Sequence, residues 1–263
     1  MNLDLKGKNA LVCGASQGIG KAVAVELAKL GCSVTVVARD EEKLKAVVSV
    51  LDRSVSQDHD FISVDFASAA NVRQRIEKYI GETEKNFHIL INNSGGPNPG
   101  PVAEAKEEDF ISAFQQHLLC NHILAQLLIP GMKKENYGRI INIISTSVKQ
   151  PLNDLGVSNT IRGAVANWSK TLANEVAKFA ITVNNVLPGA TNTERLKQII
   201  SDKSKKTGRS KDEILIAMKA NIPMQRIGEA EEIAAAIAFL ASPAASYITG
   251  INLPADGGRT SSL

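Results

Sequence analysis

NALVCGASQGIGKAVAVELAKL, residues 9–30, is the stretch that decides the fold of this chain. A short apolar run leads into Gly14, Gly18 and Gly20, and apolar residues then recur at helical spacing. Glycine suits a strand, turn and helix of this kind because the chain must reverse without Cβ clashes and its backbone must approach a pyrophosphate. The first N–H groups of the helix then face the anion. We therefore predict a phosphate-binding turn, with an ordinary strand-to-helix turn as the alternative.

Length and composition fit one globular domain, residues 1–263. The chain has 263 residues, of which 44% are hydrophobic and 22% are charged. Its formal charge of +3 is mild and evenly spread, and aromatic residues make up only 4% of the chain. This pattern gives neither the basic patch nor the stacking platform of a nucleic-acid-binding protein. We expect no nucleic-acid partner and a small-molecule substrate.

The cysteines and the apolar runs indicate the compartment. Cys13, Cys32 and Cys120 lack metal-ligand spacing and are odd in number, which favours reduced structural thiols. The first eight residues, MNLDLKGK, contain no apolar signal-peptide region, and no run approaches the roughly 18 apolar residues of a membrane span. We expect a cytoplasmic protein without a membrane partner.

Strand and helix patterns alternate along the whole chain. Strands are predicted at 10–13, 33–38, 59–66, 88–92, 138–145, 181–187 and 250–253, and most are separated by helical patterns. This order predicts an α/β fold with a mostly parallel sheet of about seven strands and helices on both faces.

The end of the second strand bears on the choice of cofactor. A dinucleotide site for NAD often has an acidic side chain there for the ribose 2′-hydroxyl, whereas a 2′-phosphate requires a cation. This strand ends in Ala38 and Arg39 follows, so the sequence favours NADP(H) over NAD(H). The alternative for Arg39 is a solvated charge at a helix start. Asp40 is interpreted as a helix N-cap.

Two later segments bear on oligomerisation and on access to the site. The predicted helix 109–132 is apolar on more than one face, which favours burial against another subunit and thus a dimer or tetramer. Residues 190–222 are polar and rich in lysine. They are either a solvated mobile segment or a lid over the substrate that attracts anions.

Five ordered motifs together resemble the short-chain dehydrogenase/reductase family. They are CGASQGIG at 13–20, NNSGG at 92–96, GRIINIIS at 138–145, the PG turn at 188–189 with Thr193 after it, and DGG at 256–258. The resemblance implies a Rossmann-type doubly wound fold that binds NAD(P)(H), with tetramers frequent. The cofactor-binding candidates are Gly14, Ser16, Gly18, Ile19, Gly20, Arg39, Asp65, Asn92, Ser94, Gly95, Arg162, Pro188, Gly189 and Thr193.

The chain departs from this family at its active site, which is usually an Asn, a Ser, a Tyr and a Lys. Ser145 matches the family Ser. By counting, Ser158 occupies the Tyr position, Arg162 the Lys position and His117 the Asn position. No tyrosine of this chain has a Lys four residues later. The catalytic candidates are therefore Ser145, Ser158, Arg162 and His117.

These replacements change the expected chemistry. A phenol with a pKa of about 10 is a suitable acid for an alkoxide, whereas Ser158 is a shorter and weaker one. Arg162 keeps the electrostatic part of the lysine role but does not relay protons. His117 is either an alternative acid or a structural residue. Ser145 either contacts a substrate oxygen or caps the turn after its strand.

Three functions remain open from the sequence. The first is an NADP(H)-dependent oxidoreductase with an atypical proton donor, acting on an unidentified carbonyl or alcohol. The second is a cofactor-binding protein without turnover, serving as a sensor or assembly subunit. The third is a relative of the halohydrin dehalogenases, which is disfavoured because those enzymes keep the Tyr and rebuild the nucleotide turn. Site geometry must decide between the first two.

Overall fold

A seven-stranded parallel sheet forms the centre of the molecule in the computed structural model, which describes residues 1–262. The strand order is β3-β2-β1-β4-β5-β6-β7, and every neighbouring pair is parallel. The strands are β1 (Asn9–Cys13), β2 (Ser33–Ala38), β3 (Asp60–Ser63), β4 (Ile89–Asn92), β5 (Gly138–Ile143), β6 (Ile181–Pro188) and β7 (Asn252–Ala255). The predicted α/β fold with about seven parallel strands is confirmed.

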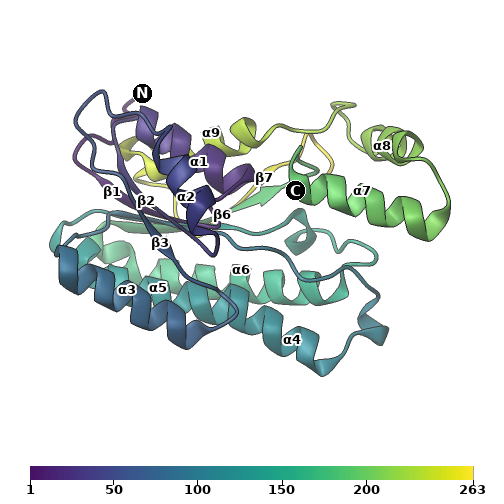
Figure 1. Cartoon of the computed structure of the whole chain (residues 1–263), viewed down its shortest axis with the longest axis horizontal. Helices are drawn as coiled ribbons and strands as arrows, with labels where there is room; N and C mark the ends of the chain where they lie inside the picture. The colour runs from purple at the N-terminus through teal and green to yellow at the C-terminus, as the bar shows by residue number, and fades with distance from the viewer. Residues whose placement is uncertain (263) are drawn as a thin grey trace.

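Helices cover both faces of this sheet (Figure 1). One face carries α1 (Gly18–Lys29), α2 (Glu41–Val48) and α9 (Ala230–Ala241), and the other carries α3 (Ala69–Thr83), α5 (Cys120–Lys134) and α6 (Gly156–Val176). Each layer buries its own apolar cluster against the sheet, since β-strand side chains alternate between the two faces. The site is therefore left to the loops at the carboxyl ends of the strands.

The predicted helix over 109–132 is one helical segment with a change of pitch inside it. It begins as α4 (Glu107–Phe114), continues through a π-helical turn (Gln115–Leu119) and ends as α5. A π-helical turn is rare and often marks a functional position, because it re-aims the side chains that it contains. His117 lies in this turn.

Some predicted boundaries were wrong by a few residues. The third strand was predicted to include Asp65, but its carboxylate already accepts a hydrogen bond from the Ala67 N–H at 2.9 Å and forms a turn. The last strand was predicted from Gly250, which instead has a positive φ of +73°. Turn chemistry at both positions overrides the apolar pattern.

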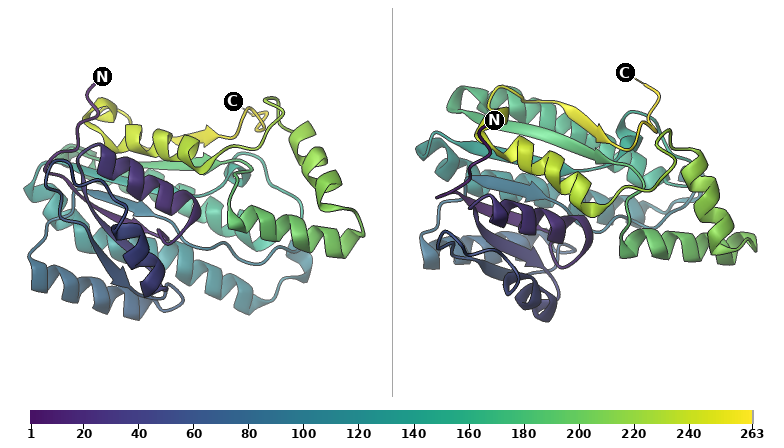
Figure 2. Two further views of the ribbon diagram at one scale, coloured as in Figure 1. Left: turned by 45° about the horizontal axis from the view of Figure 1, so that its top comes forward. Right: turned by 90° about the horizontal axis from the view of Figure 1, so that it is seen from above.

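The lysine-rich segment folds into two helices, α7 (Glu194–Thr207) and α8 (Lys211–Ala220). Both lie beyond the carboxyl ends of the strands and project away from the sheet (Figure 2). Ile200 and Ile214 are the buried apolar side chains of these helices. The Arg195 Nη2 donates to the Pro97 carbonyl at 3.0 Å, which ties α7 to the loop after β4.

A row of four asparagines crosses the sheet from β4 to β7. Asn92, Asn142, Asn185 and Asn252 are register partners on successive strands. Their side-chain amides bond to one another in sequence at 2.8, 3.0 and 2.8 Å. Buried amides are stable only when bonded in this way, so the row fixes how the four strands present their carboxyl ends.

The three cysteines are buried free thiols. Burial raises the pKa of each thiol, to about 12 for Cys120.

Within residues 1–262, helices long and apolar enough to span a bilayer are absent.

Candidate functional site

The glycine turn after β1 lies against two other chain segments, one at Asn93 and one at Thr193. Gly14 has a φ of +60°, and a Cβ added there would lie 2.7 Å from the Asn93 Nδ2. Gly18 has a φ of +55°, and its added Cβ would lie 3.3 Å from the Thr193 Cγ2. Both positions therefore require glycine for conformation and for close approach. Ser16 is partly buried in the same turn, and Ile19 packs against the apolar core at the start of α1.

The N-terminus of α1 is left without a side-chain cap. Its N-cap residue, Gln17, makes no capping hydrogen bond, and the first turn contains no acidic residue. By contrast, α2, α3 and α7 are capped by the side chains of Asp40, Ser68 and Thr193. The free N–H groups and positive dipole end of α1 are thus available to an anion such as a pyrophosphate.

Arg39 and Asp65 meet beside this turn, where β2 and β3 end. The Arg39 Nη1 lies 3.9 Å from the Asp65 Oδ2, and the Arg39 side chain is 76% exposed. A guanidinium held this loosely can reorient toward a phosphate. Asp40 accepts a hydrogen bond from the Lys43 N–H at 3.1 Å, which confirms its interpretation as an N-cap.

The end of β4 and the loop after it contribute Asn92, Ser94 and Gly95. The Asn92 Nδ2 donates to the Asn142 Oδ1, while the Asn92 Oδ1 is buried without a partner among residues 1–262. The Ser94 Oγ lies 2.7 Å from the His117 Nδ1. Gly95 is exposed, and a Cβ there would meet no atom within 4 Å. Contacts within the protein therefore do not explain why position 95 is a glycine.

His117 is buried, being 1% exposed, and its Nε2 has no hydrogen-bond partner among the described residues. Burial lowers the pKa of His117 to about 2, and the nearby charge of Arg162 lowers it as well. The imidazole is therefore neutral near pH 7. It is a hydrogen-bonding group with one unused nitrogen.

Arg162 brings a cation to the end of β5. Its side chain is 7% exposed, and its Nη1 donates to the Ile143 carbonyl at 3.1 Å, two residues before Ser145. Burial lowers the pKa of Arg162 to about 10, so the guanidinium remains charged near pH 7. Ser158 lies one turn earlier on α6 and is partly buried.

Ser145 caps the short turn that follows β5. Its Oγ accepts a hydrogen bond from the Ser147 N–H at 3.1 Å. The capping alternative from the sequence is thus observed. The hydroxyl proton of Ser145 is not used in this bond and remains available for a second partner.

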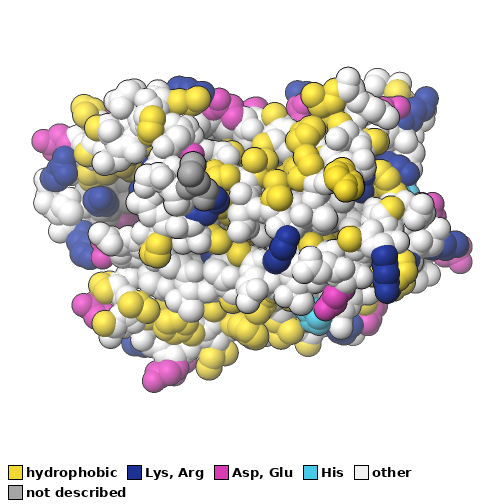
Figure 3. All heavy atoms as spheres, turned by 180° about the vertical axis from the view of Figure 1, so that it is seen from behind, with side chains coloured by type: hydrophobic (Ala, Val, Ile, Leu, Met, Phe, Trp, Pro, Cys, Tyr) yellow, Lys and Arg dark blue, Asp and Glu magenta, His cyan; other side chains and the backbone are white. Residues whose placement is uncertain are grey.

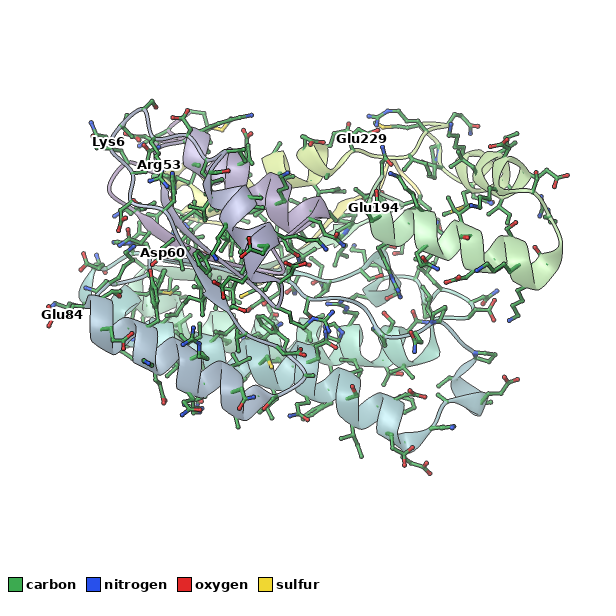
Figure 4. The ribbon with its side chains drawn as sticks, viewed as in Figure 1. Lys6, Arg53, Asp60, Glu84, Glu194 and Glu229 are labelled. Atoms are coloured by element: carbon green, nitrogen blue, oxygen red, sulfur yellow. The ribbon has the colours of Figure 1, made fainter. Side chains whose placement is uncertain are left out.

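The tyrosines lie away from the carboxyl edge of the sheet. The Tyr79 hydroxyl donates to the Asp60 carboxylate at 2.9 Å, and the Tyr137 hydroxyl donates to the Ala241 carbonyl at 2.7 Å. Asp60 begins β3, and Figure 4 shows it far from Glu194, which begins α7 at the carboxyl edge. Tyr247 is fully exposed. Within residues 1–262, no tyrosine therefore hydrogen-bonds to Ser145.

The loop after β6 packs against the C-terminal turn. The Gly189 N–H donates to the Ala255 carbonyl at 3.0 Å, and a Cβ at Gly189 would lie 2.7 Å from the Asp256 Cα. Burial opposes ionisation of Asp256, but hydrogen bonds from Thr260, Gly258 and Arg259 lower the pKa of its carboxyl overall. Pro188 ends β6 at this point.

Two hollows flank the site, and most of the residues that line them are not among the predicted site residues. A cavity of about 50 Å³ is lined by Thr146, Gln150, Leu152, Arg259 and Thr260. A larger one of about 240 Å³ is lined by residues of the 97–105 loop together with Asp109 and Val157. Gln150 accepts a hydrogen bond from the Ser261 hydroxyl at 3.2 Å, so the C-terminal segment borders the turn after Ser145. These residues come from distant parts of the chain and share no motif.

Known proteins resemble this chain over nearly its whole length. Residues 14–260 match a family model described as enoyl-(acyl carrier protein) reductase. The chain is 34% identical to the NADPH-dependent reductase BacG of Bacillus subtilis, over 97% of this chain and 99% of that protein. It is 33% identical to the 3-oxoacyl-[acyl-carrier-protein] reductase FabG of Vibrio cholerae, over 97% of this chain and 98% of that protein.

Solved structures show the same similarity. The L-sorbose reductase of Gluconobacter frateurii, solved with NADPH and L-sorbose, superposes with a TM-score of 0.93 at 30% identity and full coverage of both chains. YwfH, an NADPH-dependent reductase involved in bacilysin biosynthesis, superposes with a TM-score of 0.90 at 32% identity, over 97% of this chain and 99% of that one.

Proposed function

This chain belongs to the short-chain dehydrogenase/reductase family, and we propose that it is an NADP(H)-dependent oxidoreductase acting on a small carbonyl or alcohol compound with an atypical proton donor. Its family and relatives establish an oxidoreductase that uses NAD(P)H. The observation that supports turnover is a buried, charged Arg162 beside the end of β5, where Ser145 presents a free hydroxyl proton. Burying the Arg162 guanidinium lowers the folding stability of the protein, which favours a functional reason for its presence.

The residues present fit a dinucleotide. Its pyrophosphate would lie on the uncapped start of α1, against a turn in which Gly14 and Gly18 leave no room for a side chain. Asn92, Ser94, Gly95, Thr193 and the end of β6 would border the nicotinamide half. When bound, the nicotinamide supplies or accepts the hydride.

Arg39 supports the preference for NADP(H). Its guanidinium is exposed, and its contact with the Asp65 carboxylate at 3.9 Å is loose. Such a guanidinium would pair with a 2′-phosphate in a bidentate manner, and Asp65 would then be left for the adenine amino group. Of the two structural relatives described above, YwfH is described as NADPH-dependent and the L-sorbose reductase was solved with NADPH.

Ser145 and Arg162 would act on the reacting oxygen. Ser145 would donate its hydroxyl proton to a substrate oxygen, and Arg162 would stabilise negative charge and hold ribose hydroxyls. Ser158 would have at most a minor role, because an aliphatic hydroxyl is a poor acid. The pKa of about 2 argues against His117 as a general acid and favours a hydrogen-bonding role through Nε2.

The substrate would enter from the side of α7 and α8. We propose that residues 190–222 act as its lid within one domain, with Arg195 anchoring the lid to the loop after β4. The small cavity beside Thr146 and Arg259 would receive one end of the substrate.

We also propose a cytoplasmic homo-oligomer, a dimer or tetramer. The α4 to α5 segment exposes Ile111, Phe114 and Leu119, which are 64%, 46% and 37% exposed. Hydrophobic side chains also gather along the lower edge of the molecule seen from behind, where the layer containing α5 and α6 lies (Figure 3). Covering such surface favours association. Three unpaired cysteines suit a reducing compartment.

A cofactor-binding protein without turnover is the second candidate, supported by the absence of a phenol at position 158. Calorimetric titration with NADPH and NADH, followed by a panel of carbonyls and alcohols monitored at the nicotinamide absorbance, separates the two. Turnover that is lost in Arg162→Ala supports the enzyme. Tight binding of NADPH with no turnover across the panel supports the second candidate, and no binding of either cofactor contradicts both.

A further inference from the structure

The small cavity beside the turn after Ser145 has a positively charged lining, with no acidic side chain among the described residues that line it. The lining consists of Thr146, Gln150, Leu152, Arg259 and Thr260. The volume of about 50 Å³ suits a small polar group rather than a ring or an acyl chain, since one water takes up about 30 Å³ in the liquid. Because the charge on this lining is positive, the cavity favours an anion.

Arg259 supplies that charge, and residues 1–262 give it no ion pair. It is partly buried. Arg226, by contrast, donates to both oxygens of the Glu232 carboxylate, at 2.7 and 2.6 Å. A planar carboxylate fits a guanidinium well in this bidentate way. Arg259 can therefore offer to a ligand the pairing that Arg226 makes within the protein.

Asp256, the acidic residue nearest to Arg259 in the sequence, is used to build the turn rather than to neutralise the arginine. Its two carboxylate oxygens accept hydrogen bonds from the Gly258 N–H at 3.0 Å and from the Thr260 N–H at 2.8 Å. The Arg259 N–H in turn donates to the Asp256 carbonyl at 3.4 Å. Asp256 thus fixes the backbone from which the Arg259 side chain extends.

The uncharged polar residues of the lining can also act as donors. The Gln150 Oε1 accepts hydrogen bonds from the Ser261 N–H at 3.4 Å and from the Ser261 hydroxyl at 3.2 Å. Because a backbone N–H only donates, the amide oxygen of Gln150 must face Ser261, which leaves its NH₂ group for a ligand. The hydroxyls of Thr146 and Thr260 are donors as well. An ionised carboxylate, which only accepts, matches such a lining.

The cavity lies next to the proposed position of the reacting oxygen and under the end of the lid. Thr146 directly follows Ser145, and consecutive Cα atoms are about 3.8 Å apart. The Met224 N–H, which follows α8, donates to the Gly257 carbonyl at 3.1 Å, so the turn that carries Arg259 packs against the end of the lid. A group bound in the cavity would therefore lie only a few bonds from a carbonyl that contacts Ser145.

The lid carries charge of the same sign as the cavity. Residues 190–222 contain eight lysine and arginine residues and four acidic residues. Among the ion pairs between described residues, only the pair of Lys197 with Glu194 lies in this segment. Because α7 and α8 project beyond the carboxyl edge of the sheet (Figure 2), their excess cations would attract an anionic substrate toward the site. The lid and Arg259 thus independently favour the same class of substrate.

We propose that Arg259 determines substrate specificity, through a carboxylate subsite that it forms with the other polar residues of this cavity. The preferred substrates are short oxo acids, or the matching hydroxy acids in the reverse direction, with the carbonyl at Ser145 and the carboxylate on Arg259. This inference rests on the proposed function and names its substrate class. In reduction the carbonyl carbon takes the hydride, the carbonyl oxygen takes the proton, and the carboxylate is unchanged.

A binding test measures the subsite without turnover. Pyruvate, acetoacetate and levulinate are each compared with their methyl esters, which lack the charge, by ligand-observed NMR with and without NADP⁺, which cannot reduce them. We expect the best-bound acid to bind at least about tenfold more tightly than its ester, which corresponds to about 1.4 kcal/mol. Arg259→Gln should remove this preference and Arg259→Lys should keep part of it. Arg75→Gln, which removes an exposed arginine from α3, should leave it unchanged.

An activity test uses the same pairs of acids and esters with NADPH. The kcat/KM of wild type should be at least about tenfold higher for the preferred acid than for its ester. Arg259→Gln should lower this ratio about tenfold or more, mainly through KM, because Arg259 contacts a part of the substrate that does not react. Added salt should lower kcat/KM for the acid more than for the ester, since it screens the attraction between the lid and an anion.

The outcomes separate the two hypotheses. Failure of wild type to bind either nicotinamide cofactor contradicts the proposed function. Normal cofactor binding contradicts the carboxylate subsite alone if acids and esters bind equally, if the preference survives in Arg259→Gln, or if no acid binds at millimolar concentration. Circular dichroism shows whether each Arg259 variant is folded, and Arg259→Lys keeps the test decisive if Arg259→Gln is not.

Discussion

The Nδ1 of His117 lies 2.7 Å from the Oγ of Ser94, and this contact joins the π-helical turn between α4 and α5 to the loop after β4. Both residues are candidates for the site, and they come from segments that are not adjacent in the sequence. The contact leaves the His117 Nε2 as a buried polar atom without a partner within residues 1–262. Because buried polar atoms are normally hydrogen-bonded, the Nε2 is a candidate contact for a bound molecule.

Removal of the Ser94 hydroxyl should destabilise the cofactor-free protein. In Ser94→Ala, neither ring nitrogen of the buried His117 has a protein partner, which costs about 1–3 kcal/mol. Chemical denaturation of wild type and variant measures this difference. Ser68→Ala, which removes an exposed helix cap, is a comparison for a typical loss of about 1 kcal/mol. A Ser94→Ala variant as stable as wild type would mean that the contact adds nothing.

His117 should affect the pH dependence of stability. Its pKa in the folded protein is about 2, against an ordinary value of 6.5, so the unfolded chain binds one more proton between these values. The His117 contribution is fully present above pH 6.5 and is lost as pH falls toward 2, with a slope of at most about 1.4 kcal/mol per pH unit. His117→Asn should therefore show a shallower decline in unfolding free energy below pH 6.5. Parallel curves for the two proteins would contradict the depressed pKa.

Arg39→Ala should weaken NADPH binding selectively. The guanidinium is 76% exposed and free to meet a 2′-phosphate, so we expect the Kd for NADPH to rise about tenfold or more. The Kd for NADH should change less than about threefold, since NADH lacks that phosphate. Calorimetry with both cofactors measures the ratio, and Arg75→Ala is the charge-matched control. Equal losses for both cofactors would contradict the proposed preference.

Gly14→Ala should abolish cofactor binding and lower stability. Its φ of +60° disfavours a side chain, and the added Cβ would lie 2.7 Å from the Asn93 Nδ2 and 2.8 Å from the Asn93 carbonyl oxygen. Gly81→Ala is the matched control, because its Cβ would meet no atom within 4 Å on helix α3. That control should raise stability by about 0.5–1 kcal/mol. Thermal unfolding with and without NADPH tests both variants, and normal NADPH binding by Gly14→Ala would exclude the turn as the cofactor site.

Substitutions at Ser158 test whether the absence of the family's tyrosine limits proton donation. Ser158→Ala should change kcat/KM by less than about threefold, because its hydroxyl is a poor proton donor. The double variant Ser158→Tyr with Arg162→Lys supplies the family's phenol and ammonium, and should raise reduction of simple ketones by about 10²-fold or more. Steady-state rates on cyclohexanone measure the gain. A large loss in Ser158→Ala would show instead that Ser158 takes part in the reaction.

Much of the fold followed from local patterns. The alternation of strands and helices predicted a parallel sheet, because each connection between parallel strands needs a crossover. The continuous apolar runs indicated strands that are buried on both faces. The strand boundaries near Asp65 and Gly250 were predicted less well, since turn conformations there compete with the strand pattern.

The sequence by itself determined that a glycine-rich turn opens the chain, that an arginine follows the second strand, and that no tyrosine stands four residues before a lysine. Only the tertiary structure decided that Arg162 is a buried cation bonded to the Ile143 carbonyl, that His117 is neutral and bonded to Ser94, and that the tyrosines lie away from the site. The physical reason is that burial and charge environment depend on residues distant in sequence. Desolvation lowers the pKa values of both His117 and Arg162, and neither effect is encoded in spacing.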